Sequence, residues 1–180
     1  MGDSLITVVV IGLAAILMFV FPLATISEMN DNEVLAMVQS YTTEFVNKIR
    51  TKGKITRDDY NAYVQKLHAT GNSYEIEMET KILDENPGKK TTTASQDMIG
   101  ENVYYSEYTT VIEDKLLDPD GDQTYYLKKG DYITVTVKNT NITMGTQLKN
   151  FFYKLVGKDT YTIGATVSTL VTNTGNGINN

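Results

Sequence analysis

The chain has 180 residues, of which 41% are hydrophobic and 21% are charged, a composition typical of one folded domain with an appendage. Its formal net charge of -6 argues against nucleic acid as a partner, because binding to phosphates requires a concentrated basic face. The absence of cysteine excludes disulfides, a thiolate nucleophile and a cysteine-based zinc site.

The first predicted element is an apolar helix within residues 1–27. Leu5 to Ile26 include no charged side chain, and most of them are Leu, Ile, Val, Phe or Met. As a helix this segment would extend over about 33 Å, which matches a hydrocarbon core of about 30 Å, so we predict a transmembrane helix. The proline in it predicts a kink or local unwinding. The candidate membrane and assembly positions are Leu5, Val9, Gly12, Ile16, Phe19 and Pro22.

A cleaved signal peptide is the alternative interpretation of this segment. It requires a basic N-terminal region and small residues before the cleavage site. Residues 1–4 lack Lys and Arg, and only Thr25 and Ser27 offer a small-x-small pair. We therefore expect a retained anchor. The flank at residues 28–33 is acidic, which favours a C-terminal domain outside the cytoplasm, although the first basic residue, Lys48, is too distant for the positive-inside rule to decide the orientation.

An amphipathic stem helix is predicted next, over residues 28–53. Its apolar residues recur at steps of three and four and share one face, which would be covered by the rest of the domain or by another subunit. These residues are Val34, Val38, Tyr41, Phe45 and Ile49. Basic residues in the last turns suit the helix dipole, and Gly53 is the natural stop.

Residues 54–172 are predicted to form a globular α+β head domain. Thr56 followed by Asp59 resembles a helix-capping box, and the short helix that it begins would end near Gly71. From Tyr74 to Ile82 apolar and charged residues alternate, as in a strand with one side in water.

The remaining elements of the head are predicted from shorter patterns of β-branched, aromatic and turn-forming residues. In chain order they are an exposed loop (Asp84–Gly100), a strand (Val103–Leu117), a turn (Asp118–Asp122), a short strand (Thr124–Lys128), a tight turn (Gly130–Asp131), a strand (Tyr132–Val137), a helix (Met144–Val156) and a strand (Tyr161–Thr172). The Gly- and Asn-rich residues 173–180 are predicted to be a mobile tail.

Few residues offer catalytic or metal-binding chemistry. His68, the only histidine, lies near the end of the short helix, where a cation is favoured, so we expect a surface residue. Asp118, Asp120 and Asp122 alternate as at the start of a calcium loop, but Lys129 stands where such a loop has its final Glu, which favours a plain turn. We expect no enzyme, no cofactor and no small-molecule substrate.

The order of these elements resembles the type IV pilin superfamily, in particular the pseudopilins of tight-adherence (Tad-type) systems. The resemblance covers nearly the whole chain: an apolar span with Gly12 and Pro22 as soft points, an amphipathic stem, and an antiparallel sheet packed on that stem. The chain differs from the family pattern in lacking a basic leader that ends in Gly. It also has Leu5 near the position where mature pilins carry a Glu.

This resemblance implies a pilin-like fold in which the apolar helices of many subunits bundle into a filament core. We therefore expect a structural subunit of a bacterial surface filament or secretion apparatus, a single-pass protein of the cell membrane whose C-terminal domain is extracytoplasmic. Its partners would be membrane lipid and either copies of itself or related pilin-like subunits. The alternatives are a monomeric membrane-tethered extracellular binding module and, third, a membrane-bound hydrolase.

Overall fold

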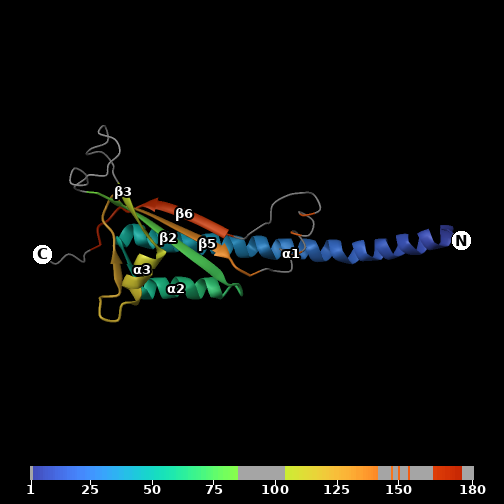
Figure 1. Cartoon of the computed structure of the whole chain (residues 1–180), viewed down its shortest axis with the longest axis horizontal. Coiled ribbons are helices and arrows are strands. Elements are labelled where there is room, and N and C mark those ends of the chain that lie inside the picture. Colours follow the sequence, from blue (N-terminus) through green and yellow to red (C-terminus); the bar gives the residue numbers. More distant parts are fainter. Residues whose placement is uncertain are drawn as a thin grey trace, which may run out of the picture. The chain divides into compact units, whose positions relative to one another are not determined.

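The computed structural model describes residues 2–84, 104–141, 147, 150, 154 and 164–175 (Figure 1). Most of the predicted Asp84–Gly100 loop, most of the predicted Met144–Val156 helix and residues 176–180 lie outside the described residues. The chain divides into two compact units, residues 1–36 with 141–163 and residues 37–140 with 164–180.

Helix α1, Gly2–Lys52, provides residues 2–36 of the first unit and continues into the second. It passes through Pro22 without local unwinding. A proline removes one backbone donor from a helix. One turn further on, the Thr25 hydroxyl donates to the carbonyl oxygen of Phe21 at 3.0 Å, an added hydrogen bond beside the proline.

The second unit contains the C-terminal part of α1 and two short helices, α2 (Arg57–His68) and α3 (Thr109–Leu117). The predicted cap of α2 is confirmed, because the Thr56 hydroxyl accepts a hydrogen bond from the Asp59 amide at 3.2 Å. The chain leaves this helix through Gly71, whose φ of +82° suits glycine.

A four-stranded antiparallel sheet forms the rest of the second unit, together with a two-stranded sheet of β1 and β4. The strand order in the larger sheet is β3-β2-β5-β6. The strands are β1 (Lys54–Thr56), β2 (Tyr74–Leu83), β3 (Tyr104–Tyr108), β4 (Thr124–Tyr126), β5 (Tyr132–Asn139) and β6 (Gly164–Leu170). The predicted α+β class, with a long N-terminal helix and an antiparallel sheet, is confirmed.

One side of the larger sheet faces the core. Val135 of β5 lies opposite Met78 of β2 and Val167 of β6, and Val135 and Met78 are at most 1% exposed. The alternate residues Glu75 and Glu77 are exposed, as the sequence alternation predicts. The core also includes side chains from the three helices: Val38, Val46, Ile49, Leu67, Ile112 and Leu116.

The prediction of one strand over Val103–Leu117 is wrong, because among the described residues of this range only Tyr104–Tyr108 is a strand and helix α3 follows at once. Aromatic and β-branched residues gave the segment a strand-like pattern. Ile112 and Leu116, however, stand four residues apart and are both fully buried, which a helix achieves on one face. Tertiary packing thus overrides local preference.

The first residues of the predicted mobile tail are held in place. The Thr172 amide donates to the Arg50 carbonyl at 3.1 Å, and the Asn173 side chain donates to the Thr51 carbonyl at 2.8 Å. The Gly175 amide donates to the Leu127 carbonyl at 3.0 Å. Residues 172–175, here termed the C-terminal strap, therefore cap the end of α1 and join it to the chain beyond β4.

Candidate functional site

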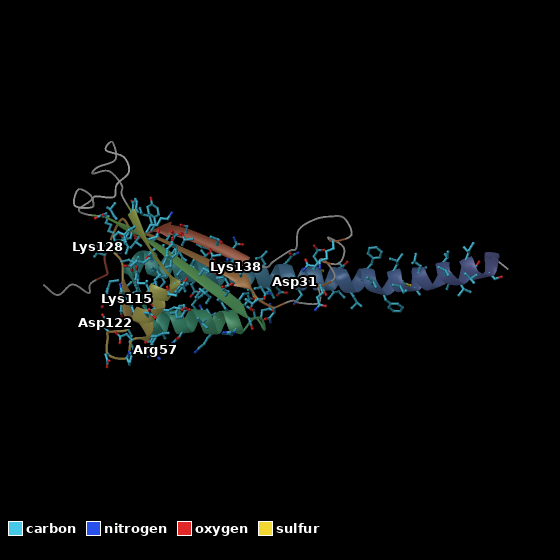
Figure 2. The ribbon with its side chains drawn as sticks, in the orientation of Figure 1. Asp31, Arg57, Lys115, Asp122, Lys128 and Lys138 are labelled. Atoms are coloured by element: carbon cyan, nitrogen blue, oxygen red, sulfur yellow. The ribbon has the colours of Figure 1, made fainter. Side chains whose placement is uncertain are left out.

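The N-terminal part of α1 exposes an unusual amount of apolar surface. Leu5 is 69% exposed, Ile16 62% and Phe19 71%. The side chains drawn on this segment project outward from the helix (Figure 2). Its most apolar window has a mean hydropathy of 2.8 and none of it is buried, so this helix is long and apolar enough to cross a membrane.

The candidate assembly positions on this segment share a geometric pattern. Leu5, Val9, Gly12, Ile16 and Phe19 recur at steps of four and three, which places them on one face of the helix. All five are exposed, and a side chain added at Gly12 would meet nothing within 4 Å. Pro22 is exposed as well. This face has the spacing with which helices pack against one another.

At its other end α1 packs side by side with α2 (Figure 1). The rings of Phe45 and Tyr63 are stacked, with centroids 4.3 Å apart. The Thr42 hydroxyl donates to the Val38 carbonyl at 2.7 Å and shares a hydrogen bond with the Tyr63 hydroxyl at 2.8 Å. Burial raises the pKa of Tyr63 to about 12, so it stays protonated at neutral pH.

Ion pairs flank this helix contact. Lys48 and Lys52 approach the two carboxylate oxygens of Asp59, at 2.6 Å and 3.1 Å. Burial raises the pKa of Asp59, but the hydrogen bonds from the two lysines outweigh it, and the pKa lies below its usual value. Lys66 pairs with Glu44 at 2.7 Å. These pairs therefore link α1 to α2.

The predicted stem residues are distributed over both units. Val38, Phe45 and Ile49 are at most 4% exposed in the second unit, and Tyr41 there is half-buried with Lys66 Nζ 5.8 Å from its ring centroid. Val34 is 6% exposed and belongs to the first unit.

Sequence reasoning missed two buried residues in the part of this helix that belongs to the second unit. Val46 is 1% exposed and lies eight residues after Val38, a spacing that would have placed it on the stem face. Thr42 is also fully buried. A polar threonine carries no apolar signal, so its position opposite Tyr63 was not detectable from periodicity.

A small hollow opens between α2, β2 and α3. Its volume is about 200 Å³, and its lining residues are Tyr60, Val64, Leu67, His68, Tyr74, Ile76 and Glu113. The Tyr60 hydroxyl donates to Glu113 Oε1 at 2.6 Å. Burial, and next the carboxylate of Glu113, raise the pKa of Tyr60. His68, predicted as a surface residue, is exposed at the edge of this hollow.

A second, more polar hollow of about 350 Å³ lies beside β3 and β4. Tyr125 borders it, and its hydroxyl is 2.7 Å from Thr80 Oγ1 and 2.8 Å from Glu107 Oε2. Lys115 Nζ lies 3.7 Å from Glu107 and 4.9 Å from the Tyr125 ring centroid. Glu107 and Lys115 of this hollow thus pair with each other.

The turn that carries Asp118, Asp120 and Asp122 is exposed. Its carboxylates accept backbone hydrogen bonds: Asp118 from the Asp120 amide at 3.0 Å and Asp122 from the Thr124 amide at 3.3 Å. Within the described part of the chain, no three His, Cys, Asp or Glu side chains gather in a way that could hold a metal ion. The turn follows helix α3 instead of the predicted strand.

No family model, curated protein or solved structure matches the chain. What the geometry offers is an apolar helix face without cover, one end of the same helix fixed in a packed head, and a small hollow with a single carboxylate. These features suit anchoring, packing and recognition.

Proposed function

We propose that the chain is a pilin-like structural subunit of a bacterial surface filament or secretion apparatus, held in the cell membrane by α1 until it assembles. The observation that carries the proposal is the exposed apolar face of α1, Leu5 to Phe19, on a helix whose other end is fixed in the head. A soluble monomer rarely exposes a continuous apolar surface of this size.

The same helix face suits lipid and a bundle of helices. Each large apolar side chain gains about 1.5–3 kcal/mol when it is removed from water, so both environments are strongly preferred over solvent. Moving from lipid into a helix bundle exchanges one apolar environment for another, so close packing decides the outcome. Gly12 lets a neighbouring helix approach closely, because it has no side chain in the way.

In this proposal the head lies outside the cytoplasm. The acidic residues Glu28 and Glu33, C-terminal to the apolar segment, support that orientation. Assembly then requires no catalysis, only the release of α1 from lipid and its packing against other subunits.

The proposal is tested by fractionating cells that produce the chain. Surface material is removed by shearing and inspected by electron microscopy, and the chain is followed in the sheared and membrane fractions. We expect it in sheared fibres. Gly12→Leu should keep membrane insertion but reduce the fibre fraction, whereas Val10→Leu, on the opposite side of the helix, should behave as the natural chain does.

Recovery of the natural chain from membranes alone, as a monomer in detergent, would contradict assembly. That outcome would favour the second candidate function, a monomeric membrane-tethered binding module. The hollow lined by Tyr60, Tyr74 and Glu113 supports this alternative, because it offers a carboxylate and aromatic rings in one concave place.

A further inference from the structure

The hollow between α2, β2 and α3 combines an apolar floor with one carboxylate. Val64 and Ile76 are half-buried and Leu67 is buried, so the floor is partly accessible. Tyr60 and Tyr74 contribute aromatic rings, and Glu113 contributes the acid. Its volume of about 200 Å³ is below the roughly 300–1,000 Å³ of pockets for drug-sized ligands, which indicates room for about one side chain.

Glu113 differs from four carboxylates of the second unit in its partner. Four acidic residues are each paired with lysine: Glu44, Asp59, Glu77 and Glu107. Glu113 is held by the Tyr60 hydroxyl through Oε1, and among the described residues no lysine or arginine pairs with it. The acid is therefore oriented without being neutralised.

Hydrogen bonds position the two tyrosines that line the hollow. Tyr60 is positioned by its 2.6 Å hydrogen bond to Glu113. Tyr74 shares a hydrogen bond with Thr70 Oγ1 at 2.8 Å and accepts one from Asn72 at 3.4 Å. Aromatic faces attract cations, so rings beside a carboxylate favour a positively charged group.

We propose that this hollow is a docking site for a lysine side chain presented by a protein partner, with Glu113 binding the ammonium group and Val64, Leu67 and Ile76 contacting the aliphatic stem. Lysine suits the hollow because its ammonium group is compact and its stem is aliphatic. The hydrogen bond from Tyr60 uses one lone pair of Oε1, and the ammonium group needs only one of the acceptor positions that remain on Glu113. This inference concerns the head and goes beyond assembly through α1.

The test uses the full chain in detergent micelles with isotope-labelled isoleucine methyl groups. The methyl signal of Ile76 is followed by NMR during titration, at one fixed pH, with Nα-acetyl-lysine methylamide. Parallel titrations use the norleucine analogue, which keeps the stem and lacks the charge, and n-butylammonium. Two variants are compared: Glu113→Gln, which can still accept from Tyr60, and Glu107→Gln, a matched control in the other hollow.

We expect saturable shifts of Ile76 with the lysine compound. Binding should weaken about tenfold or more for the norleucine analogue and for Glu113→Gln, since charged hydrogen bonds contribute more than neutral ones. Glu107→Gln should bind within about twofold of the natural chain.

Equal binding of norleucine, unchanged binding by Glu113→Gln, or no shift up to about 50 mM would overturn the proposal. Tight binding of n-butylammonium without binding of the lysine compound would mean a free amine site and reject a protein partner. If Glu113→Gln does not fold, the ligand comparison on the natural chain still decides.

Discussion

Replacing Gly53 with alanine should weaken the head much more than the same change at Gly71. Both glycines lie just beyond a helix end in the left-handed region, with φ of +65° and +82°. A side chain at Gly71 would meet nothing within 4 Å. At Gly53 it would collide with the backbone of the C-terminal strap, at Asn173, Thr174 and Gly175.

The expected magnitudes follow from these contacts. Alanine in the left-handed region costs about 1 kcal/mol at either position. At Gly53 the collision also displaces the strap and the chain next to it. Two backbone hydrogen bonds are at risk, from the Leu127 amide to the Gly53 carbonyl at 2.8 Å and from the Gly175 amide to the Leu127 carbonyl at 3.0 Å. At about 1 kcal/mol each, they bring the loss for Gly53→Ala to about 3 kcal/mol, against about 1 kcal/mol for Gly71→Ala.

Urea unfolding of the full chain in a non-ionic detergent measures both values. The near-UV circular dichroism of the tyrosines reports on the head, since the chain has 12 tyrosines and no tryptophan. Free energies of unfolding are obtained by linear extrapolation, with the slope held common to all variants. Equal losses for the two alanine variants would refute the argument that the strap is packed against Gly53.

Three further predictions concern single side chains. Thr42→Val should lower the free energy of unfolding in urea by about 1–2 kcal/mol, because the Tyr63 hydroxyl loses its partner. The control Thr43→Val, at an exposed position, should change it by no more than about 0.5 kcal/mol. Equal losses for the two variants would contradict this. The lowered pKa of Asp59 stabilises the head above the unfolded-state pKa, and that contribution, about 1 kcal/mol at most, is lost as pH falls through the folded-state pKa. Asp59→Asn should therefore flatten the acid side of the stability profile, and an unchanged profile would speak against the lysine pairs. Phe19→Lys should make membrane insertion of α1 less favourable by about 3 kcal/mol and so reduce the carbonate-resistant membrane fraction. An unchanged fraction would indicate that α1 does not enter lipid.

Local sequence patterns were sufficient to predict those elements whose structure depends on their own residues. The cap of α2 at Thr56 and the strand alternation of β2 follow from short-range chemistry, and both are present as predicted. The apolar segment of α1 likewise follows from composition alone. The sequence was ambiguous from Thr109 to Leu117. Its β-branched residues favour a strand, and only the four-residue spacing of Ile112 and Leu116 indicates the helix.

Other features depend on partners that are distant in the sequence. The strand order places β5 between β2 and β6, which no local pattern specifies. The hollow near Glu113 exists only because Tyr60 is brought to it across 53 positions of sequence. The strap is the clearest case, because composition suggested mobility at Asn173 to Gly175. The carbonyl groups of Thr51 in α1 and of Leu127 supply the hydrogen-bond partners that hold these residues.

The contacts of the strap also bear on the order in which parts of the chain fold. Thr172 and Asn173 bond to carbonyls 122 positions earlier in the chain, so the end of α1 acquires its final partners only after that whole interval has been synthesised and brought back. Pairings between such remote positions are slow to form, whereas a single apolar helix needs no remote contact to enter a bilayer. An apolar helix such as the N-terminal part of α1 could therefore enter a bilayer before the head becomes rigid.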